Sequence, residues 1–317
     1  MVSIIIPAYN AEKHILESVE SALRQDCKKE ILIIDDHSED HTWDILQDTY
    51  SGTKEVQIIK NEQKGSNPAR NLGLKYASGN YIQFLDADDI LGDQKIVSQL
   101  KHLENLDSCA IASCPWYHFV NHIDDTDTTF SERVWRTYDH PIDWLIDAWN
   151  GGGMMQTACW LTPGHTIQKS GGWNETITKN QDGEFFCRVL LHSSSVRFVG
   201  SSTVYYRKPI EGHISASIGY EACSSLISTY NLYTQNTLQK HQNKSLKMAL
   251  ANNFYRFIYE TSPHHQNLLA EARTRIDELG RHKPVNVGGR IFKIMTLIMG
   301  FSLAINLRDM LKSIFRK

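Results

Sequence analysis

Three carboxylates crowd together where an apolar run of the sequence ends. Asp86, Asp88 and Asp89 directly follow the run Tyr81–Leu85. Like charges at this spacing repel one another, so a strand end that gathers them usually offers them to a cation. Carboxylate oxygens suit Mg²⁺ or Mn²⁺, which keep part of their water shell and bridge to phosphate oxygens. The alternative is a solvated turn that caps a helix, because Asp is favoured in both. The position at a strand end favours the metal site.

A second acidic cluster closes another apolar run, Glu30–Asp35. It reads Asp35-Asp36-His37-Ser38. In a nucleotide-binding α/β sheet, an acidic side chain at this place can accept hydrogen bonds from ribose hydroxyls or from a base N–H. The alternative is an N-cap for the helix expected to start near Thr42, which Ser38 or Asp40 could supply. Both interpretations can hold, because the cap needs only one of these residues.

Two further charged residues lie where helices are expected to open. Arg70 would place a cation near a diphosphate, or it is a surface helix residue. Asp182 is a natural cap at a helix start, where the macrodipole stabilises a carboxylate. The functional alternative is a general base that removes the proton of an acceptor hydroxyl. Sequence position alone leaves both pairs of alternatives open.

These residues need a scaffold, and the first half of the chain alternates apolar runs with helical patterns. The expected strands are Val2–Tyr9, Glu30–Asp35, Val56–Lys60 and Tyr81–Leu85, and the expected helices are His14–Gln25, Thr42–Tyr50 and Ala69–Ala77. Continuous apolar runs separated by helices predict a parallel sheet covered on both faces, the doubly wound α/β class. Such sheets bind ligands at the carboxyl ends of their strands, where the acidic clusters are found.

Composition and charge exclude several classes of protein. The 317 residues are 41% hydrophobic and 22% charged, as in an ordinary folded protein, and the net charge of -3 argues against a nucleic-acid partner. The six cysteines show no zinc-type spacing and indicate a reducing compartment. The first residues form a strand-like run and lack a signal-peptide pattern, so a cytoplasmic location is expected.

Taken in order, the motifs resemble those of family 2 glycosyltransferases, which have the GT-A fold. Any one of them is a weak signal, whereas the ordered set is highly specific. It covers about residues 1 to 215 and consists of Val2–Asn10, Ile33–Ser38, Ala69–Gly73, Ser78–Asp89, and Gln181-Asp182 with Arg188.

The resemblance implies a role for each matching position. Asp88 would be the main metal ligand through the D-x-D motif Asp86-Ala87-Asp88, and Asp182 would be the catalytic base. Asp36 would hold a uracil-type base or its ribose. The expected donor nucleotide-binding residues are Pro7, Ala8, Tyr9, Asp36, Arg70 and Asp86. The reaction would invert the anomeric carbon, with Mg²⁺ or Mn²⁺ stabilising the departing nucleoside diphosphate.

The chain departs from the family pattern at two places. Gln181 stands where the family usually has Glu before the base, which keeps the base and removes a neighbouring charge. Pro209 stands where many GT-A enzymes place a metal-binding His after a Tyr-Arg pair. His213 follows four residues later and could replace it, but we expect a metal held by carboxylates and diphosphate alone. The Q-x-x-R-W signature of processive synthases is absent, so transfer of a single sugar in polysaccharide assembly is implied.

Two other functions are compatible with this fold class, a dinucleotide-dependent dehydrogenase and a catalytically degenerate transferase. A dinucleotide-dependent dehydrogenase shares the sheet class but needs G-x-G-x-x-G after the first strand, and this turn reads Pro-Ala-Tyr-Asn-Ala-Glu. A catalytically degenerate protein would keep the fold as a nucleotide-sugar-binding or scaffold subunit. The presence of both Asp88 and Asp182 argues against that alternative.

The C-terminal third suggests two further segments. We expect a GT-A domain over 1–215, a helical extension over 216–282 and a membrane-associating tail over 283–317. The segment from Arg281 onward carries +7, which leaves about -10 for the rest of the chain.

Within the tail, Ile294–Leu307 is uncharged but too short to span a bilayer with confidence. It is a buried core helix or, as the charge favours, a helix in the interface of the inner membrane, where a lipid-linked acceptor would be met. Its expected contacts with anionic headgroups are Arg290, Lys293, Arg308, Lys312, Arg316 and Lys317.

Overall fold

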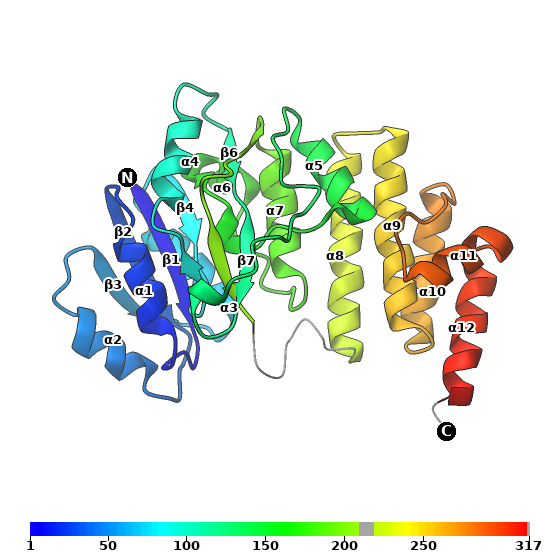
Figure 1. Cartoon of the computed structure of the whole chain (residues 1–317), viewed down its shortest axis with the longest axis horizontal. Helices are drawn as coiled ribbons and strands as arrows, with labels where there is room; N and C mark the ends of the chain where they lie inside the picture. Colours follow the sequence, from blue (N-terminus) through cyan, green and yellow to red (C-terminus); the bar gives the residue numbers. More distant parts are fainter. Residues whose placement is uncertain (209–218, 316–317) are drawn as a thin grey trace. The chain divides into compact units, whose positions relative to one another are not determined.

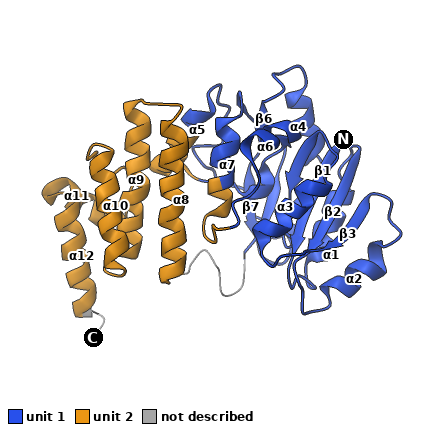
Figure 2. Cartoon of the chain, turned by 180° about the vertical axis from the view of Figure 1, so that it is seen from behind, with its two compact units in different colours: residues 1–144, 154–175, 185–212 blue, residues 145–153, 176–184, 213–317 orange. Residues whose placement is uncertain are grey.

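The computed structural model describes residues 1–208 and 219–315. The chain divides into two compact units. The first unit comprises residues 1–144, 154–175 and 185–212, and the second comprises 145–153, 176–184 and 213–317 (Figure 2).

A five-stranded sheet forms the centre of the first unit (Figure 1). Its first four strands in the chain are parallel and the short fifth is antiparallel, which confirms the expected mostly parallel sheet. Its core is apolar because Ile4, Ile5 and Ile6 of the middle strand have no exposed surface. In spatial order the strands are β3 (Val56–Lys60), β2 (Lys29–Asp35), β1 (Val2–Ala8), β4 (Tyr81–Phe84) and β8 (Thr162–Pro163).

Helices cover both faces of this sheet. The chain moves outward from β1 through β2 to β3 and then returns to the other side of β1 with β4. Right-handed crossovers therefore place α3 on the face opposite α1 and α2, as Figures 1 and 2 show from the two sides. The helices of this unit are α1 (Ile15–Leu23), α2 (Thr42–Tyr50), α3 (Ser66–Tyr76), α4 (Lys95–Leu103), the first part of α5 (Pro141–Asp147), α6 (Gly164–Ser170) and most of α7 (Gln181–Leu191).

Two small sheets extend the first unit. In one, β10 (Val204–Arg207) runs antiparallel to β5 (Ile90–Leu91) and parallel to β7 (Trp116–Phe119). In the other, β6 (Ile111–Ser113) pairs with β9 (Val196–Phe198). Because β5 directly follows the acidic cluster at the end of β4, the first small sheet brings β10 beside that cluster.

The second unit is helical. Its first three helices are α8 (Tyr220–Leu238), α9 (Lys244–Thr261) and α10 (Gln266–Glu278), which pack on one another. Asn243 begins α9 as a side-chain cap, with its Oδ1 accepting from the Leu246 N–H at 2.8 Å. Segment 145–153 joins this unit because Asn252 Nδ2 donates to the Trp149 carbonyl at 2.7 Å.

The tail differs from the single helix expected there. Gly300, with φ of +80°, separates α11 (Arg290–Met299) from α12 (Phe301–Phe315). The alternative of a buried core helix is wrong, because Leu297 is 80% exposed. Arg316 and Lys317 lie outside the described residues. Within the part of the chain that the structure covers, no helix combines the length and apolarity needed to cross a bilayer.

Arg308 does not have the role expected for it. Its side chain is only 11% exposed and pairs with Asp309 at 2.6 Å. It also donates to the Ser262 carbonyl at 3.0 Å, and its guanidinium lies 4.6 Å from the centre of the Tyr259 ring. Arg308 therefore fastens α12 to α9, and the expectation that it contacts lipid headgroups is wrong.

Gly79, in the turn before β4, packs closely against the first residues of β1. A Cβ at this position would lie 2.5 Å from the Ser3 backbone nitrogen. We therefore predict that Gly79→Ala lowers the free energy of unfolding by about 2 kcal/mol, because backbone has to shift to make room. Urea denaturation measures the change.

Gly52→Ala is the matched control, since no atom lies within 4 Å of its added Cβ. It should change stability by no more than about 0.5 kcal/mol. Equal effects of the two substitutions would show that the close packing at Gly79 does not contribute to the free energy of unfolding.

Candidate active site at the carboxyl ends of the strands

Of the acidic side chains after β4, Asp89 has a structural role. It has no exposed surface, and it accepts hydrogen bonds from Gln156 Nε2 at 2.5 Å and from the Arg207 N–H at 3.0 Å. Burial raises the pKa of Asp89 well above its ordinary range, and the nearby charges of Asp88 and Asp86 raise it further. The three carboxylates thus lie close together, as expected. Because Asp89 is buried and accepts hydrogen bonds within the protein, we do not assign it as a cation ligand.

Arg207 fastens the loop that carries these carboxylates. Its Nε donates to the Asp88 carbonyl at 2.9 Å and its Nη1 to the Val120 carbonyl at 3.0 Å. Its Nη2 pairs with Glu17, and its guanidinium lies 4.3 Å from the centre of the Phe119 ring. In the sequence, Tyr206-Arg207 served only to locate the position of an expected histidine, and the contacts of Arg207 itself were not predicted. Pro209 and His213, on which that expectation fell, lie outside the described residues.

Arg70 is held inside the first unit, so the alternative of a surface helix residue is wrong. Its side chain is 10% exposed, and Nη2 donates to Asp86 Oδ1 at 2.8 Å. The guanidinium lies 4.5 Å from the centre of the Trp173 ring, which in turn stacks on Phe185 at 4.2 Å. The stack joins α3, the loop before α7 and α7 itself. Trp173 is a second residue that sequence reasoning overlooked, because nothing in its local pattern indicates this contact.

Asp36 organises the loop between β3 and α3. Its Oδ1 accepts from Asn61 Nδ2 at 2.8 Å, and both carboxylate oxygens accept from the Gly65 N–H, at 2.8 and 2.9 Å. Gly65 has φ of +134°, which a side chain would disfavour. A carboxylate has about four lone-pair directions, so Asp36 keeps acceptor capacity for one further donor.

The N-cap residue of α2 is His41, whose side chain forms no cap, and Asp40 instead accepts from the first N–H of the helix. The Oδ1 of Asp40 accepts from the Thr42 N–H at 3.0 Å and from the Thr42 hydroxyl at 2.6 Å. Ser38 instead accepts from the Asn10 N–H at 3.1 Å, which ties the ends of β1 and β2 together. Asp36 is therefore not needed as a cap.

The end of β1 lies beside Asp36. Ala8 is fully buried and pairs in register with Asp35, while its carbonyl accepts from the Asp36 N–H at 2.7 Å. Pro7 lies within the strand, and Tyr9, the first residue beyond it, is 48% exposed. A ring and a carboxylate thus follow neighbouring strand ends, the arrangement predicted for a base pocket.

Asp182 lies in the first turn of α7, in the segment 176–184 that groups with the second unit. The residue before the helix, Asn180, has φ of +61° and donates from Nδ2 to the Tyr233 hydroxyl at 2.8 Å. Gln181 donates from Nε2 to the Thr178 carbonyl at 3.1 Å. The helix start agrees with a carboxylate stabilised by the macrodipole. Its role as a base stays a prediction.

The donor set fits a cation that relies on phosphate for much of its coordination. Among residues 1–208 and 219–315, no group of three or more His, Cys, Asp or Glu side chains is arranged as a metal site. Asp88 is half-buried, and Asp86 is 30% exposed with one oxygen on Arg70. Mg²⁺ and Mn²⁺ sites of this kind use one or two carboxylates, with water and phosphate oxygens as the other ligands.

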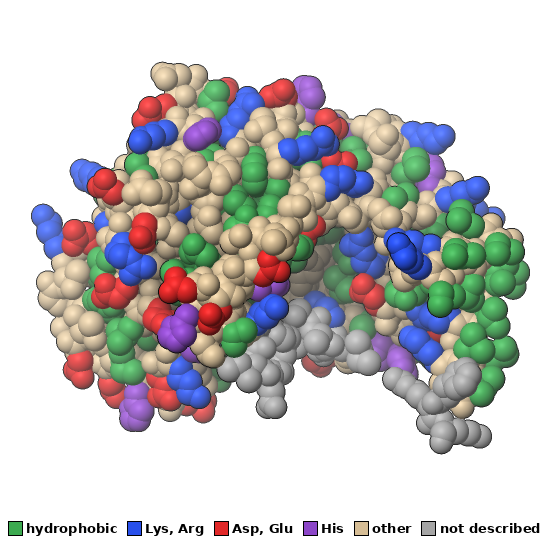
Figure 3. Space-filling view, viewed as in Figure 1, with side chains coloured by type: hydrophobic (Ala, Val, Ile, Leu, Met, Phe, Trp, Pro, Cys, Tyr) green, Lys and Arg blue, Asp and Glu red, His purple; other side chains and the backbone are tan. Residues whose placement is uncertain are grey.

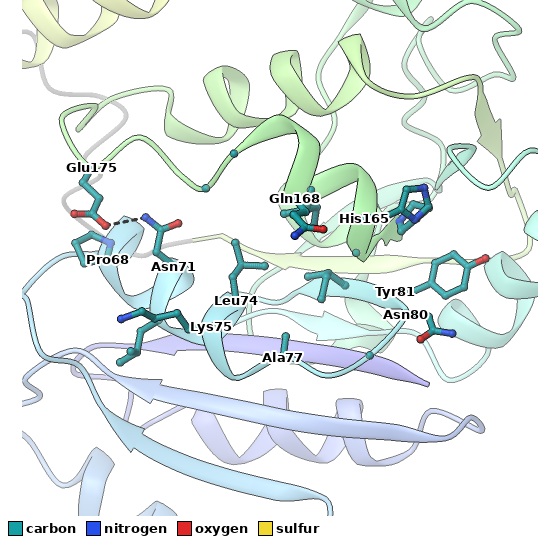
Figure 4. A pocket seen from close by; sticks show the side chains of 18 of the residues that line it. Pro68, Asn71, Leu74, Lys75, Ala77, Asn80, Tyr81, His165, Gln168 and Glu175 are labelled. Atoms are coloured by element: carbon teal, nitrogen blue, oxygen red, sulfur yellow. Dashed lines mark hydrogen bonds between the residues drawn. The ribbon is translucent and has the colours of Figure 1, made fainter.

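A cavity of about 1060 Å³ lies in the first unit, between α3, α6 and the edge formed by β4 and β8 (Figure 4). Amide side chains line much of it, including Asn71, Asn80 and Gln168, and Asn71 donates to Glu175 at 2.8 Å. None of Asp36, Asp86 or Asp88 lines it. The cavity therefore does not contain these residues, but it lies next to Asp36, because Asn61 lines it.

Comparison with known proteins shows which family the chain belongs to. Residues 3–162, which contain β1 to β4 and the acidic cluster, match the model of "Glycosyl transferase family 2". The chain belongs to glycosyl transferase family 2. The match includes Asp36, Arg70, Asp86 and Asp88 and ends before Asp182.

Several glycosyltransferases are similar to part of the chain. The Escherichia coli UDP-Glc:alpha-D-GlcNAc-diphosphoundecaprenol beta-1,3-glucosyltransferase WfaP is 47% identical over 105 residues, which are 33% of this chain and 41% of that protein. The E. coli enzyme WfgD, with the same activity in its name, is 44% identical over 103 residues, 32% of this chain and 40% of that protein. The Streptococcus pneumoniae serotype 4 glycosyltransferase GlyG is 24% identical over 218 residues, 66% of this chain and 71% of that protein. The chain thus matches about two fifths of the length of the two E. coli enzymes.

Solved structures show the same fold. Staphylococcus aureus TarS 1–349 in complex with UDP superposes with a TM-score of 0.63 at 16% identity, covering 88% of this chain and 89% of that one. The same protein with UDP-GlcNAc gives 0.60. These similarities and the mostly parallel sheet confirm the GT-A fold with added C-terminal helices.

The fastening of the acidic loop by Arg207 leads to a prediction about stability. A lysine at this position offers one ammonium in place of a fork, so at least two of the hydrogen bonds are lost. We expect Arg207→Lys to lower the free energy of unfolding by about 2–4 kcal/mol. Urea denaturation followed by circular dichroism tests this.

Arg24→Lys provides the control, because Arg24 forms an exposed ion pair with Asp93. It should cost less than about 1 kcal/mol. If both lysine variants were equally stable, Arg207 would not be the residue that fastens the loop.

Proposed function

We propose that this chain is an inverting glycosyltransferase that moves one sugar from a nucleotide diphosphate sugar, a UDP-sugar, to an acceptor hydroxyl in cell-surface polysaccharide assembly. The observation that carries the proposal is the pair of acidic strand ends. Asp36 follows β2 with spare acceptor capacity, and Asp86 and Asp88 follow β4 on a loop fastened by Arg207. Family membership and the UDP-glucose transfer named for WfaP and WfgD support the same assignment.

The nucleotide would bind where β1 and β2 end. Tyr9 is 48% exposed, and the Lys64 ammonium lies 5.0 Å from the centre of its ring. The other face of the ring would stack on a base, and the remaining lone pair of Asp36 can accept from a uracil N–H or a ribose hydroxyl. Pro7 and Ala8 shape this pocket through the backbone of β1, because Ala8 has no exposed side-chain surface.

The diphosphate would meet opposite charges from α3 and β4. Arg70 supplies a fixed guanidinium, whose position is set by Asp86 and the Trp173 ring. Asp88, with Asp86 beside it, would hold Mg²⁺ or Mn²⁺. When bound, that ion would neutralise the negative charge that develops on the leaving nucleoside diphosphate. Preorganisation by Arg207 and Asp89 means that the loop need not rearrange as this charge forms.

Asp182 would act on the acceptor. A carboxylate within reach of the acceptor hydroxyl can take its proton as the oxygen attacks the anomeric carbon. Attack opposite the leaving group inverts that carbon. Phe185, one helical turn further along α7, is stacked on Trp173, so α7 carries both this stack and the proposed base.

Lipid-linked glycans are the acceptor class that we favour. WfaP and WfgD carry diphosphoundecaprenol, a lipid carrier, in the names of their reactions. An acceptor of this kind is presented at the cytoplasmic face of the inner membrane. The proposed location of the chain is therefore peripheral, on that surface.

Asp182→Asn separates an enzyme from a binding protein of the same fold. The amide cannot take a proton, so we expect transfer to fall by about a hundredfold to ten-thousandfold. Affinity for UDP, measured by calorimetry with Mn²⁺ present, should remain as in the unaltered chain. Sugar release from a panel of UDP-sugars measures turnover.

Asp44→Asn is the matched control, because Asp44 is also an acidic residue in the first turn of a helix, α2. Both substitutions lose the same favourable interaction with a helix dipole. Full activity of Asp182→Asn would show that Asp182 is not the base. Absence of turnover in the unaltered chain, with UDP binding present, would support the scaffold alternative.

Asp88→Asn tests the metal site. Loss of the anionic ligand should weaken UDP binding in the presence of Mn²⁺ by at least about tenfold, which corresponds to about 1.4 kcal/mol. Binding of UDP in the presence of a chelator should be the same for the variant and the unaltered chain. An unchanged response of the variant to Mn²⁺ would contradict the assignment of Asp88.

A further inference from the structure

The strongest unassigned feature is an apolar surface on the last two helices. Eight large hydrophobic side chains on α11 and α12 are at least 40% exposed. Hydrophobic side chains gather over these two helices in the space-filling view (Figure 3). We define the tail surface as these eight residues, Ile291, Ile294, Leu297, Ile298, Leu303, Met310, Leu311 and Ile314.

The tail surface is the outer side of helices whose inner sides are already packed. Phe292 is 5% exposed and its ring lies 4.7 Å from that of Tyr259 on α9. Phe301, the first residue of α12, lies 4.7 Å from Tyr255 of α9 and 5.8 Å from Phe292. These aromatic contacts pack the inner face of both helices against α9. The exposed hydrophobic residues are therefore surplus to folding, and a surface of this kind marks an interaction site.

Helical spacing keeps the exposed residues on one side of each helix. On α11, Ile291, Ile294 and Ile298 follow at intervals of three and four residues. On α12, Leu303, Met310 and Ile314 follow at seven and four. Each helix thus buries one face and exposes an apolar stripe, as expected of helices that lie in a membrane interface.

The exposed charges on these helices have one sign. Arg290 and Lys293 lie one helical turn from Ile294 and Leu297, and Lys312 is exposed near the end of α12. The single acid on either helix, Asp309, is 14% exposed and paired with Arg308. Within the described part of both helices, the cations therefore have no exposed carboxylate beside them. In a membrane interface, the apolar stripe would contact acyl chains and the cations would contact anionic headgroups.

This charge pattern disfavours a second copy of the chain as the occupant. A twofold interface places the same patch on both partners. Arg290 and Lys293 of one copy would then face cations of the other without an acid on these helices to offset them. A lipid surface offers the opposite charge at the headgroups and no such conflict.

From these observations we infer that α11 and α12 form a two-helix anchor that lies in the interface of a membrane containing anionic lipid, with the tail surface inserted among the acyl chains. Gly300 allows the bend between the helices, and Arg308 fixes the anchor to α9. The inference deepens the proposed function, because a lipid-linked acceptor would be met at that surface.

Vesicle binding by the full chain tests the anchor. Cosedimentation is measured with phosphatidylcholine vesicles and with vesicles that also contain phosphatidylglycerol. The double variant Leu297→Gln with Ile298→Gln should lose roughly a hundredfold in affinity, because two side chains no longer leave water on binding. Both positions are highly exposed, so folding is expected to be unaffected. Tyr76→Gln is the control, since Tyr76 is 51% exposed on α3, and it should bind vesicles as the unaltered chain does.

The charge contribution is tested separately. Lys293→Gln should weaken binding by about fivefold on the anionic vesicles and leave binding to phosphatidylcholine unchanged. Added salt should reduce the difference, because these charges are exposed. Equal binding of Lys293→Gln and the unaltered chain to anionic vesicles would overturn the assignment of anionic lipid.

Two outcomes overturn the anchor itself. One is vesicle binding by the double variant equal to that of the unaltered chain. The other is absence of vesicle binding together with self-association that the double variant abolishes, which would make a second copy the occupant. UDP-sugar turnover with a soluble acceptor, measured on the same samples, distinguishes this failure from failure of the proposed function. The double variant should keep that turnover.

Discussion

Mutual repulsion among the carboxylates after β4 is the constraint on which the candidate site depends. Three acidic side chains within four residues cannot remain together unless the surrounding structure compensates them. The chain does so by giving each a different environment. Asp89 is buried and hydrogen-bonded, Asp86 is paired with Arg70, and Asp88 is held through its backbone by Arg207. Asp88, which is half-buried, is the carboxylate that we propose as the main ligand of an external cation.

The compensating groups come from distant parts of the chain. Arg70 belongs to α3, and Arg207 ends β10, more than a hundred residues after the loop it fastens. Trp173 and Phe185 extend the contact of Arg70 as far as α7. A donor site that grips a diphosphate must keep its charges still, because charge reorganisation during the reaction costs free energy. Rings and guanidinium groups restrict these side chains without adding further acidic groups.

Local sequence pattern was sufficient for the four parallel strands of the sheet and for the places of the acidic residues, but it did not predict the short antiparallel β8. Buried parallel strands such as β1 and β2 contain continuous runs of isoleucine and leucine, so their class can be predicted from hydrophobicity and their limits to within a residue. The roles of Arg207, Gln156 and Trp173 could not be predicted, because each depends on a contact with a residue far away in the sequence. The tail shows the same limit. Its exposed cations were predicted from composition, whereas the inward orientation of Arg308 depends on Tyr259 and Ser262.

The position of Arg207 in the chain has a consequence for the order in which the protein is made. A ribosome completes β4 and its carboxylates long before it adds residue 207. Until then the nascent loop lacks its guanidinium clamp, and the acidic side chains are kept apart by water. The segment that defines the family ends at residue 162, so it contains the carboxylates and not their clamp. The charged edge of the sheet is therefore among the last features of the first unit to mature during synthesis.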